Sequence, residues 1–426
     1  MARRLPLVVI LGATGSGKTK LSIELAQRFK GEIISADSMQ VYKGLDIITA
    51  KATKEEQSLA PHHLLDILDP HETFTVVEYR NSALKIIDSL LNRSKLAIVV
   101  GGTNYYIESL LWKILIEAPG EHVKALPDIV NKDHELPSEE LHKKLKLLDP
   151  NMARRLHPNN KRKILRSLEV LYQKGRQHSA ILEEQQKAQG ASQSGGGLRY
   201  NNALIFHLQC DKDVLDGRLN QRVDKMVQEG LVQELLGFHE MYNKNRINST
   251  EAPDYTKGVF QSIGFKEFHS YFTLSDEDRE SEKGKNELEK CIEELKMVTR
   301  RYARKQNKWT NNRFLGRRDR EVPPLYGLDV TDLDKWDENV TQPAVEIVES
   351  FINGSDCKHK PLPMQQTSSN PNSEDDTYFC ETCERTFVGN FQWLDHLGSR
   401  RHKKMKERKS KQEKSAGVVN EITNVV

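Results

Sequence analysis

A glycine-rich octapeptide near the start of the chain has the composition of a phosphate-binding loop. Residues 12–19 lie between an apolar run and a helical pattern, which is the context that this motif requires. The glycines allow successive backbone N–H groups to surround an anion, Lys18 adds a positive charge, and the Thr19 hydroxyl can bind Mg²⁺. We therefore predict a site for a diphosphate or triphosphate, formed by Gly12, Ala13, Thr14, Gly15, Ser16, Gly17, Lys18 and Thr19.

The acidic residue with which a nucleotide hydrolase holds its metal is missing from the expected place. Such enzymes carry an acid at the end of a second strand. The best candidate strand, Leu96–Val100, is followed instead by Gly101-Gly102-Thr103. Hydrolysis of a nucleotide is therefore disfavoured.

A carboxylate follows a different apolar segment. Asp37 and Ser38 come just after Glu32–Ser35, so both are expected at the carboxyl edge of the sheet, beside the phosphate-binding loop. A proton acceptor next to a diphosphate indicates group transfer. The alternative, that Asp37 only caps the following helix, stays open at this stage.

Alternating strands and helices are predicted to position these groups. Apolar runs predict strands over Leu5–Leu11, Glu32–Ser35, Leu96–Val100 and Ala203–Leu208. Helical patterns cover Lys18–Phe29 and Val76–Leu91, and further ones cover 213–243 and 287–308. This order is typical of an α/β fold. We predict a P-loop NTPase-like parallel sheet flanked by helices.

Two basic helical surfaces are predicted. Between residues 142 and 178 the chain has eleven Lys or Arg against two acids, within a stretch that lacks strand patterns. The helix over 287–308 combines an apolar stripe with a basic flank formed by Arg300, Arg301, Arg304, Lys305 and Lys308. Such surfaces favour a polyanionic partner, although a solvated face is the usual role of any single charge.

A zinc-binding pattern lies near the end of the chain. Cys380, Cys383, His396 and His402 have the spacing of a C2H2 zinc finger. Four protein ligands close the coordination sphere, so we predict a structural Zn²⁺ rather than a catalytic one. RNA binding is one role for this finger, and protein binding or localisation is the alternative.

Eight ordered blocks of sequence resemble the tRNA dimethylallyltransferases, also called tRNA isopentenyltransferases. The resemblance spans about residues 1 to 320, and the zinc finger makes the chain similar to the eukaryotic members. The blocks are Gly12–Thr19, Ile34–Tyr42, Gly44–Lys51, Pro61–Asp66, Val100–Tyr105, His157–Asn159, Gln261–Glu267 and Thr299–Gln306.

The resemblance implies a reaction and its chemistry. A dimethylallyl group would pass from dimethylallyl diphosphate to N6 of the adenine just 3′ of a tRNA anticodon. Asp37 would accept the proton of the weakly nucleophilic amine. Lys18, the loop amides, Mg²⁺ near Thr19 and the Arg222 guanidinium would stabilise the departing pyrophosphate.

The resemblance also assigns further residues of the site. Arg222 is the preferred diphosphate-binding arginine and Arg218 the second choice, with two solvated helix arginines as the alternative. The residues expected to contact tRNA are Asp37, Ser38, Met39, Gln40, Thr103, Arg162, Lys163, Arg166 and Gln261. The zinc finger and the basic residues after it would strengthen binding to the tRNA anticodon stem-loop.

The 426 residues allow several domains. We expect a core over 1–120 and 198–345, a helical tRNA-binding insert over 121–197, a linker over 346–376, a zinc finger over 377–404, and a disordered basic tail over 405–426. We also expect a monomer.

The amino-acid composition indicates the cellular compartment but says little about the reaction. Lys and Arg number 64 against 61 acids, and no apolar run approaches the roughly 20 residues of a membrane span. Five clustered cysteines favour a reducing compartment over a disulfide framework. We expect a cytoplasmic protein without a membrane contact. Mitochondrial or nuclear pools are compatible with this, but four residues before the first strand leave no room for an import presequence.

Two other functions fit part of the pattern. A small-molecule or nucleoside kinase would share the phosphate-binding loop, Asp37 and the paired arginines. A non-catalytic RNA-binding protein on an enzyme scaffold would share the basic surfaces, but the set of Lys18, Thr19, Asp37 and Arg222 argues against it.

Overall fold

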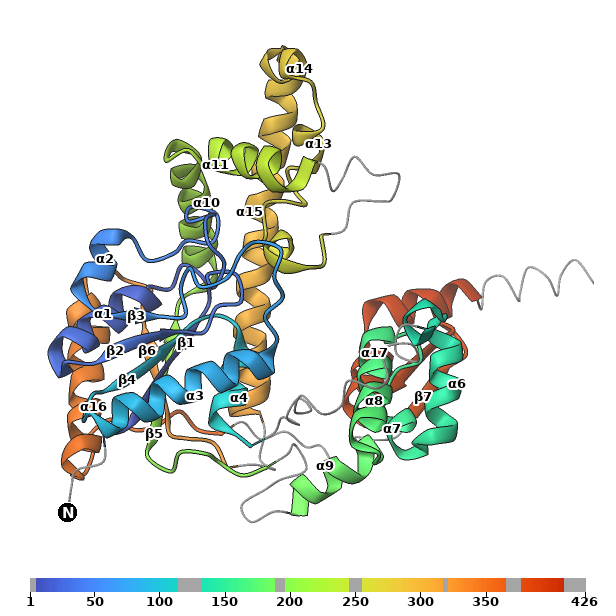
Figure 1. Ribbon diagram of the computed structural model, residues 1–426, viewed down its shortest axis with the longest axis horizontal. Coiled ribbons are helices and arrows are strands. Elements are labelled where there is room, and N and C mark those ends of the chain that lie inside the picture. Colours follow the sequence, from blue (N-terminus) through green and yellow to red (C-terminus); the bar gives the residue numbers. More distant parts are fainter. Residues whose placement is uncertain are drawn as a thin grey trace, which may run out of the picture. The chain divides into compact units, whose positions relative to one another are not determined.

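The chain divides into two compact units, seen in the computed structural model of Figure 1. One unit comprises Met1–Leu115 with Gly197–Gln365, and the other comprises Ile116–Gly196 with Gln366–Val426. The structure describes residues 5–113, 132–187, 196–244, 255–316, 321–364 and 377–409. Parts of the predicted insert, linker and basic tail therefore lie outside the described residues.

A six-stranded sheet forms the centre of the first unit. The strand order is β3-β2-β4-β1-β5-β6, and every pairing is parallel. The strands are β1 (Leu7–Gly12), β2 (Glu32–Ser35), β3 (His62–His63), β4 (Ala97–Val100), β5 (Ala203–Gln209) and β6 (Leu325–Asp329). The predicted α/β fold is confirmed. The sequence analysis misses β3, which has only two residues, and β6, which contains a glycine in its middle.

Alternate residues of β1 pack on opposite faces of the sheet. Leu7, Val9 and Leu11 belong to one hydrophobic cluster, whereas Val8 and Ile10 belong to another. This two-sided burial is typical of parallel sheets. It explains why the strand reads as one continuous apolar run in the sequence.

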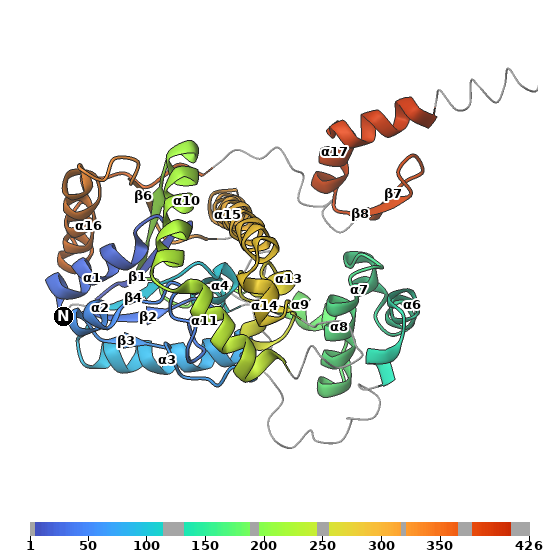
Figure 2. The ribbon, with the colours of Figure 1, turned by 90° about the horizontal axis from the view of Figure 1, so that it is seen from above.

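Helices cover both faces (Figures 1 and 2). The first cluster receives α3 (Val76–Asn92) and α4 (Asn104–Leu111), and the second receives α1 (Lys18–Phe29) and α16 (Gln342–Asn353). A capping box, in which the Thr75 side chain accepts from the backbone N–H of Glu78, begins α3. Since α16 ends at Asn353, the first eight residues of the predicted linker are helical.

A helical arm extends from the carboxyl side of the sheet. It contains α10 (Lys212–Gln228), α11 (Leu231–Phe238), the π-helix His239–Asn243, α13 (His269–Phe272), α14 (Asp276–Glu280) and α15 (Glu282–Thr310). The helical pattern predicted over 213–243 is confirmed and is divided into two helices at Gly230, where φ is 101°. Aromatic side chains, among them Phe238, Phe265 and Phe268, fill the arm's core.

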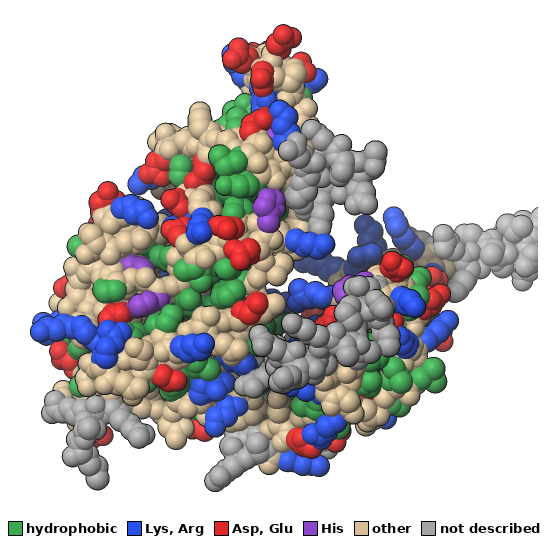
Figure 3. All heavy atoms as spheres, viewed as in Figure 1, with side chains coloured by type: hydrophobic (Ala, Val, Ile, Leu, Met, Phe, Trp, Pro, Cys, Tyr) green, Lys and Arg blue, Asp and Glu red, His purple; other side chains and the backbone are tan. Residues whose placement is uncertain are grey.

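Charge is distributed unevenly along this arm. Its tip carries Asp276, Glu277 and Asp278 on α14, which contribute to the acidic group at the top of Figure 3. The predicted basic flank of α15 starts only at Arg300. A polyanion is therefore expected to approach the sheet-proximal half of α15 rather than the tip.

The second unit contains a helical bundle and the zinc finger. Its described helices are α6 (Ser138–Leu148), α7 (Pro150–Arg155), α8 (Lys161–Lys174) and α9 (His178–Lys187), and Leu141, Ile164 and Leu168 lie in their core. Asp149 is fully buried, where it caps α7 through Met152 and accepts from the Ser179 hydroxyl at 2.6 Å. The predicted helical insertion is confirmed.

The finger consists of β7 (Thr377–Cys380), β8 (Arg385–Val388) and α17 (Asn390–Gly398). Its two strands pair in an antiparallel manner. Residues 400–409 are also helical. The prediction of a disordered tail over 405–426 is therefore wrong for residues 405–409, and residues 410–426 lie outside the described residues. Among the described residues, no helix has the length and apolarity needed to cross a bilayer.

Candidate active site

A cavity of about 980 Å³ opens at the carboxyl ends of β1, β2 and β4 in the first unit. Parallel α/β sheets bind ligands at this edge, where the chain crosses from one face of the sheet to the other. Its lining includes the phosphate-binding loop, the turn after β2 and the sheet-proximal half of α15. The predicted site residues in the lining are Thr14, Gly15, Gly17, Lys18, Thr19, Asp37, Ser38, Met39, Gln40, Arg222 and Gln261.

The phosphate-binding loop requires glycine at two positions. Gly15 and Gly17 have φ values of 77° and 86°, a region that glycine adopts without strain. A Cβ on Gly17 would also lie 2.6 Å from a ring carbon of Trp336, and one on Gly15 would lie 2.8 Å from Leu219. Close packing on both sides therefore fixes the course of the loop into the start of α1.

Lys18 is held above its own loop by weak acceptors. Its ammonium group donates to the carbonyls of Gly12 and Ala13 at 3.0 and 2.8 Å. The pKa of Lys18 is lowered to about 8, mainly by burial; the charge of Asp37 opposes this shift and the charge of Arg222 contributes to it. A bound diphosphate would supply the strong negative partner that the free loop lacks.

Asp37 both caps a turn and faces the cavity. Its Oδ1 accepts from the backbone N–H groups of Met39 at 2.9 Å and Gln40 at 3.4 Å. Among the described residues, hydrogen bonds are formed with Oδ1 alone, which leaves Oδ2 for a ligand. Burial raises the pKa of Asp37, while the Met39 N–H and the charge of Lys18 oppose the rise. The capping role and the proposed proton-acceptor role are thus compatible.

Side chains next to Asp37 fix the backbone of its turn. The Thr103 hydroxyl accepts from the Ser38 N–H at 3.0 Å and donates to the Ser38 hydroxyl at 3.2 Å. The Gln40 amide donates to the carbonyls of Thr49 and Ala50. Thr103 does not contribute to the described cavity lining, so it contacts the site through Ser38.

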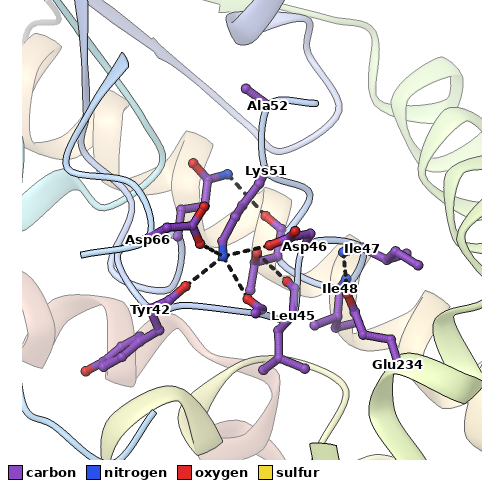
Figure 4. Close-up of polar contacts among 12 residues, drawn as sticks. Tyr42, Leu45, Asp46, Ile47, Ile48, Lys51, Ala52, Asp66 and Glu234 are labelled. Carbon is purple, nitrogen blue, oxygen red and sulfur yellow. Dashed lines mark hydrogen bonds and ion pairs between the residues drawn. The ribbon is translucent and has the colours of Figure 1, made fainter. Parts of the chain in front are cut away.

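Residues 44–52, which we call the wall loop, contribute residues 46–52 to the cavity lining. Figure 4 shows the polar contacts that hold this loop. The buried Lys51 ammonium donates to the carbonyls of Tyr42 and Gly44 at 2.6 and 2.7 Å, and to the carboxylates of Asp46 and Asp66. Four acceptors around one cation hold both ends of the loop together.

A carboxylate from another helix holds the middle of the wall loop. Glu234 on α11 accepts from the backbone N–H groups of Ile47 at 2.8 Å and Ile48 at 3.0 Å. Burial raises the pKa of Glu234. The sequence analysis assigns no role to Lys51 or Glu234. Lys51 lies in a block that carries the family resemblance, but Glu234 has no local sequence signal.

The two arginines predicted for the diphosphate have different surroundings. Arg222 on α10 lines the cavity, and burial lowers its pKa. Arg218 donates to the carbonyls of Val330 and Thr331, both at 2.6 Å, and is absent from the described lining. These contacts give Arg218 a structural role at the loop after β6. Of the two arginines only Arg222 lines the described cavity, and its role toward a diphosphate stays a prediction.

The remaining residues predicted to contact tRNA are dispersed. Gln261 is exposed on the cavity rim, where its side chain donates to the Gly258 carbonyl. Arg162, Lys163 and Arg166 lie on α8 of the second unit, the first two exposed and the third paired with Glu169 at 3.3 Å. Their roles toward tRNA stay predictions.

The finger brings its four predicted ligands together. The donor atoms of Cys380, Cys383, His396 and His402 all lie within 4.8 Å of one another. His402 Nδ1 is 3.5 Å from each sulfur and 3.1 Å from His396 Nε2. Tetrahedral zinc with ordinary bond lengths separates its ligands by about 3.3–3.8 Å, so this donor set fits a structural Zn²⁺.

Fold and cavity together define a class of protein, an α/β protein with a parallel sheet in which a glycine-rich loop carrying Lys18 and a carboxylate, Asp37, line one cavity at the same sheet edge. The IPP transferase family matches residues 40–313, and a zinc-finger family of C2H2 type matches residues 378–402. The chain therefore belongs to the IPP transferase family, as its resemblance predicts, and is an enzyme of the prenyltransferase type.

Individual relatives agree with this assignment. The chain is 48% identical to the tRNA dimethylallyltransferase of Mus musculus, covering 94% of this chain and 86% of that protein. It is 33% identical to the Saccharomyces cerevisiae enzyme of the same name, and the alignment covers 95% of this chain and 93% of that protein. A solved structure of a eukaryotic dimethylallyltransferase acting on tRNA has a TM-score of 0.78 and 31% identity, covering 96% of this chain and 98% of that one.

Proposed function

We propose that this enzyme transfers a dimethylallyl group from dimethylallyl diphosphate to N6 of the adenine immediately 3′ of the anticodon in certain tRNAs, releasing pyrophosphate. The observation that carries the proposal is the shared cavity, in which Lys18 and Thr19 lie with Asp37 in one lining. The names of the relatives supply the prenyl donor and the tRNA acceptor.

The diphosphate is assigned to the phosphate-binding loop. Lys18, the loop amides and Arg222 provide positive charge where negative charge develops on the leaving oxygen. Thr19 lines the same cavity, and a hydroxyl beside phosphate oxygens suits Mg²⁺, which prefers hard oxygen ligands. A bound Mg²⁺ would neutralise part of the pyrophosphate charge.

The acceptor amine is assigned to the Asp37 side of the cavity. The lone pair of an exocyclic adenine amine is delocalised into the ring, so the amine is a weak nucleophile. As the bond from N6 to the allylic carbon forms and the bond from carbon to oxygen breaks, the N6 proton passes to Asp37 Oδ2. Such general-base help accelerates reactions by about 10²- to 10⁴-fold.

The tRNA is assigned to the basic surfaces. The target base must leave its stack to enter the cavity, at a cost of roughly a few kcal/mol. The basic flank of α15, which starts at Arg300, lies on the helix that lines the cavity with Tyr302 and Gln306. Arg162 and Lys163 on α8 and the zinc finger would add backbone contacts.

Incorporation of a labelled prenyl group tests the proposal. We expect the protein to move label from dimethylallyl diphosphate into tRNA that has an adenine 3′ of its anticodon, and not into the same tRNA with guanine at that position. Nucleoside mass spectrometry of the product would locate the label on N6. Consumption of ATP without tRNA, together with no incorporation of label, would favour a kinase instead.

A further inference from the structure

The side chain of Gln306 joins two parts of the site that are distant in the sequence. Its Oε1 accepts from the backbone N–H of Thr14 at 2.8 Å, and its Nε2 donates to the carbonyl of Gly102 at 3.2 Å. Thr14 belongs to the phosphate-binding loop and Gly102 to the turn after β4. The Gln306 residue is only 6% exposed, so both contacts are shielded from water.

The glycine turn is shaped around this amide. A Cβ on Gly102 would lie 2.0 Å from Gln306 Nε2, and one on Gly101 would lie 2.2 Å from the Ala36 carbonyl. A larger residue at Gly102 would displace the Gln306 amide, and one at Gly101 would displace the turn from the end of β2. The two glycines therefore allow the turn to lie between the residue before Asp37 and the helix that carries Gln306.

The connection continues to the acceptor side of the cavity. Thr103, the next residue of the turn, bonds the backbone N–H of Ser38. The phosphate-binding loop is thus connected to the segment that contains Asp37. Thr14 bonds Gln306, Gln306 bonds Gly102, and Thr103, which follows Gly102, bonds Ser38. Tyr302, one helical turn before Gln306, lines the same cavity, and burial together with the charge of Asp37 raises its pKa.

The carboxamide of Gln306 satisfies both contacts of this position. The Thr14 N–H needs an acceptor and the Gly102 carbonyl needs a donor, and one planar amide supplies both. A carboxylate lacks the donor, an ammonium lacks the acceptor, and an aliphatic side chain leaves two buried backbone groups unpaired. Asparagine has the same amide on a shorter side chain.

We propose that Gln306 is a positioning residue that holds the phosphate-binding loop at a fixed distance from the Asp37 turn, so that the donor carbon and the acceptor amine meet. This inference rests on the proposed prenyl transfer. Small displacements of reacting groups reduce rates strongly, by about 10²-fold for 1 Å. Gln306 would therefore act mainly on kcat, because both ends of its amide are engaged by the backbone of the loop and of the turn.

Two substitutions separate positioning from general stability. Gln306→Leu removes both hydrogen bonds and adds no charge. Gln306→Glu keeps the acceptor for Thr14 but places a negative charge next to the diphosphate site. Thr310→Val is the matched control, since Thr310 is a buried polar residue of the same helix whose hydroxyl donates only to the helical carbonyl of Gln306.

We expect Gln306→Leu to lower kcat by about 10- to 100-fold with the KM for tRNA changed less than about threefold. Gln306→Glu should show the same loss of kcat and, in calorimetry without tRNA, weaker binding of dimethylallyl diphosphate than Gln306→Leu. Thr310→Val should keep kcat. If Gln306→Leu does not fold, Gln306→Asn takes its place, with a reduced kcat again expected.

Other results would overturn the inference. It fails if folded Gln306→Leu keeps kcat within about twofold of the wild type, if Thr310→Val loses as much activity, or if the Gln306→Glu and Gln306→Leu variants bind the donor equally. A wild-type protein that transfers no label would refute the proposed function instead. The calorimetric comparison would still decide whether Gln306 lies against the donor loop.

Discussion

The Thr103 hydroxyl accepts a hydrogen bond from the backbone N–H of Ser38 over 3.0 Å and thereby joins the turn after β4 to the turn after β2. The resemblance assigns Thr103 to the residues expected to contact tRNA. The structure shows that it also holds the segment that contains Asp37. A change at this position should therefore affect the geometry of the proton acceptor.

Substitution of Thr103 tests this relationship. Thr103→Val keeps the size of the side chain but removes the hydroxyl, and we expect kcat to fall about tenfold, because the Ser38 N–H loses its partner. Thr103→Ser should restore most of the rate. Steady-state kinetics with saturating tRNA checks both, and a Thr103→Val enzyme with the kcat of the wild type would show that the contact is dispensable.

Donor binding should take up a proton at mildly alkaline pH. The pKa of Lys18 is lowered to about 8 in the free protein, so above this pH its ammonium group increasingly loses its proton. A bound diphosphate favours the charged form and raises that pKa, so protein and donor together gain a proton. Calorimetry at about pH 8.5 in two buffers of different ionisation enthalpy measures this uptake.

The same shift predicts how KM depends on pH. The KM for dimethylallyl diphosphate should rise as pH increases through about 8, since neutral Lys18 attracts the anion less. Lys18→Met should bind the donor weakly at every pH and show no proton uptake. Uptake of a full proton by Lys18→Met would assign the titration to another group.

The acidic limb of the rate profile should report Asp37. Its pKa is raised above the ordinary value of 3.8 by burial, and the carboxylate must be ionised to accept a proton. The value of kcat should therefore decline as pH falls through the raised pKa, and an inflection at a pH above that of an exposed aspartate is expected. A pH-independent kcat down to about pH 4 would contradict the assignment.

The wall loop should depend on Lys51. Lys51→Met removes the donor to the Tyr42 and Gly44 carbonyls and to the Asp46 and Asp66 carboxylates, which are 60% and 30% exposed. Because solvent can reach both carboxylates, the cost is that of acceptors left unpaired, about 1–3 kcal/mol. We expect this loss in the free energy of unfolding by urea. Lys54→Met, at an exposed lysine two residues after the loop, should change it by less than about 0.5 kcal/mol.

Removal of the zinc finger should affect binding more than chemistry. A variant lacking residues 377–426 loses the structural zinc site and its basic residues. We expect a higher Kd for tRNA, a weaker dependence of that Kd on salt, and an unchanged kcat at saturating tRNA. An inactive truncated protein with normal tRNA affinity would instead place the finger in the catalytic step.

Local sequence was sufficient for the parts of the site built from consecutive residues. The phosphate-binding loop, Asp37 after β2 and the four zinc ligands all follow from short patterns. Arg222 and Arg218 could not be separated in this way, since four residues along a helix share one face. The loop after β6, more than a hundred residues later, provides the carbonyls that bind Arg218.

The supporting residues depend on contacts between distant segments. Glu234 accepts a hydrogen bond from Ile47, which lies 187 residues earlier in the sequence. Gln306 accepts one from Thr14, which lies 292 residues earlier. No periodicity or spacing in either helix indicates such partners. The helical pattern over 213–243 is confirmed, but it did not indicate the break at Gly230, where a left-handed residue separates two helices.

Replacement of Asp37 by asparagine tests the central claim most directly. Asp37→Asn keeps the side-chain oxygen that caps the turn at Met39 but removes the proton acceptor. We predict that single-turnover prenyl transfer slows by about 10²- to 10⁴-fold, whereas the Kd values for tRNA and for dimethylallyl diphosphate stay within about threefold of the wild type. Transfer at the wild-type rate, or a loss of rate fully explained by weaker binding, would contradict the account.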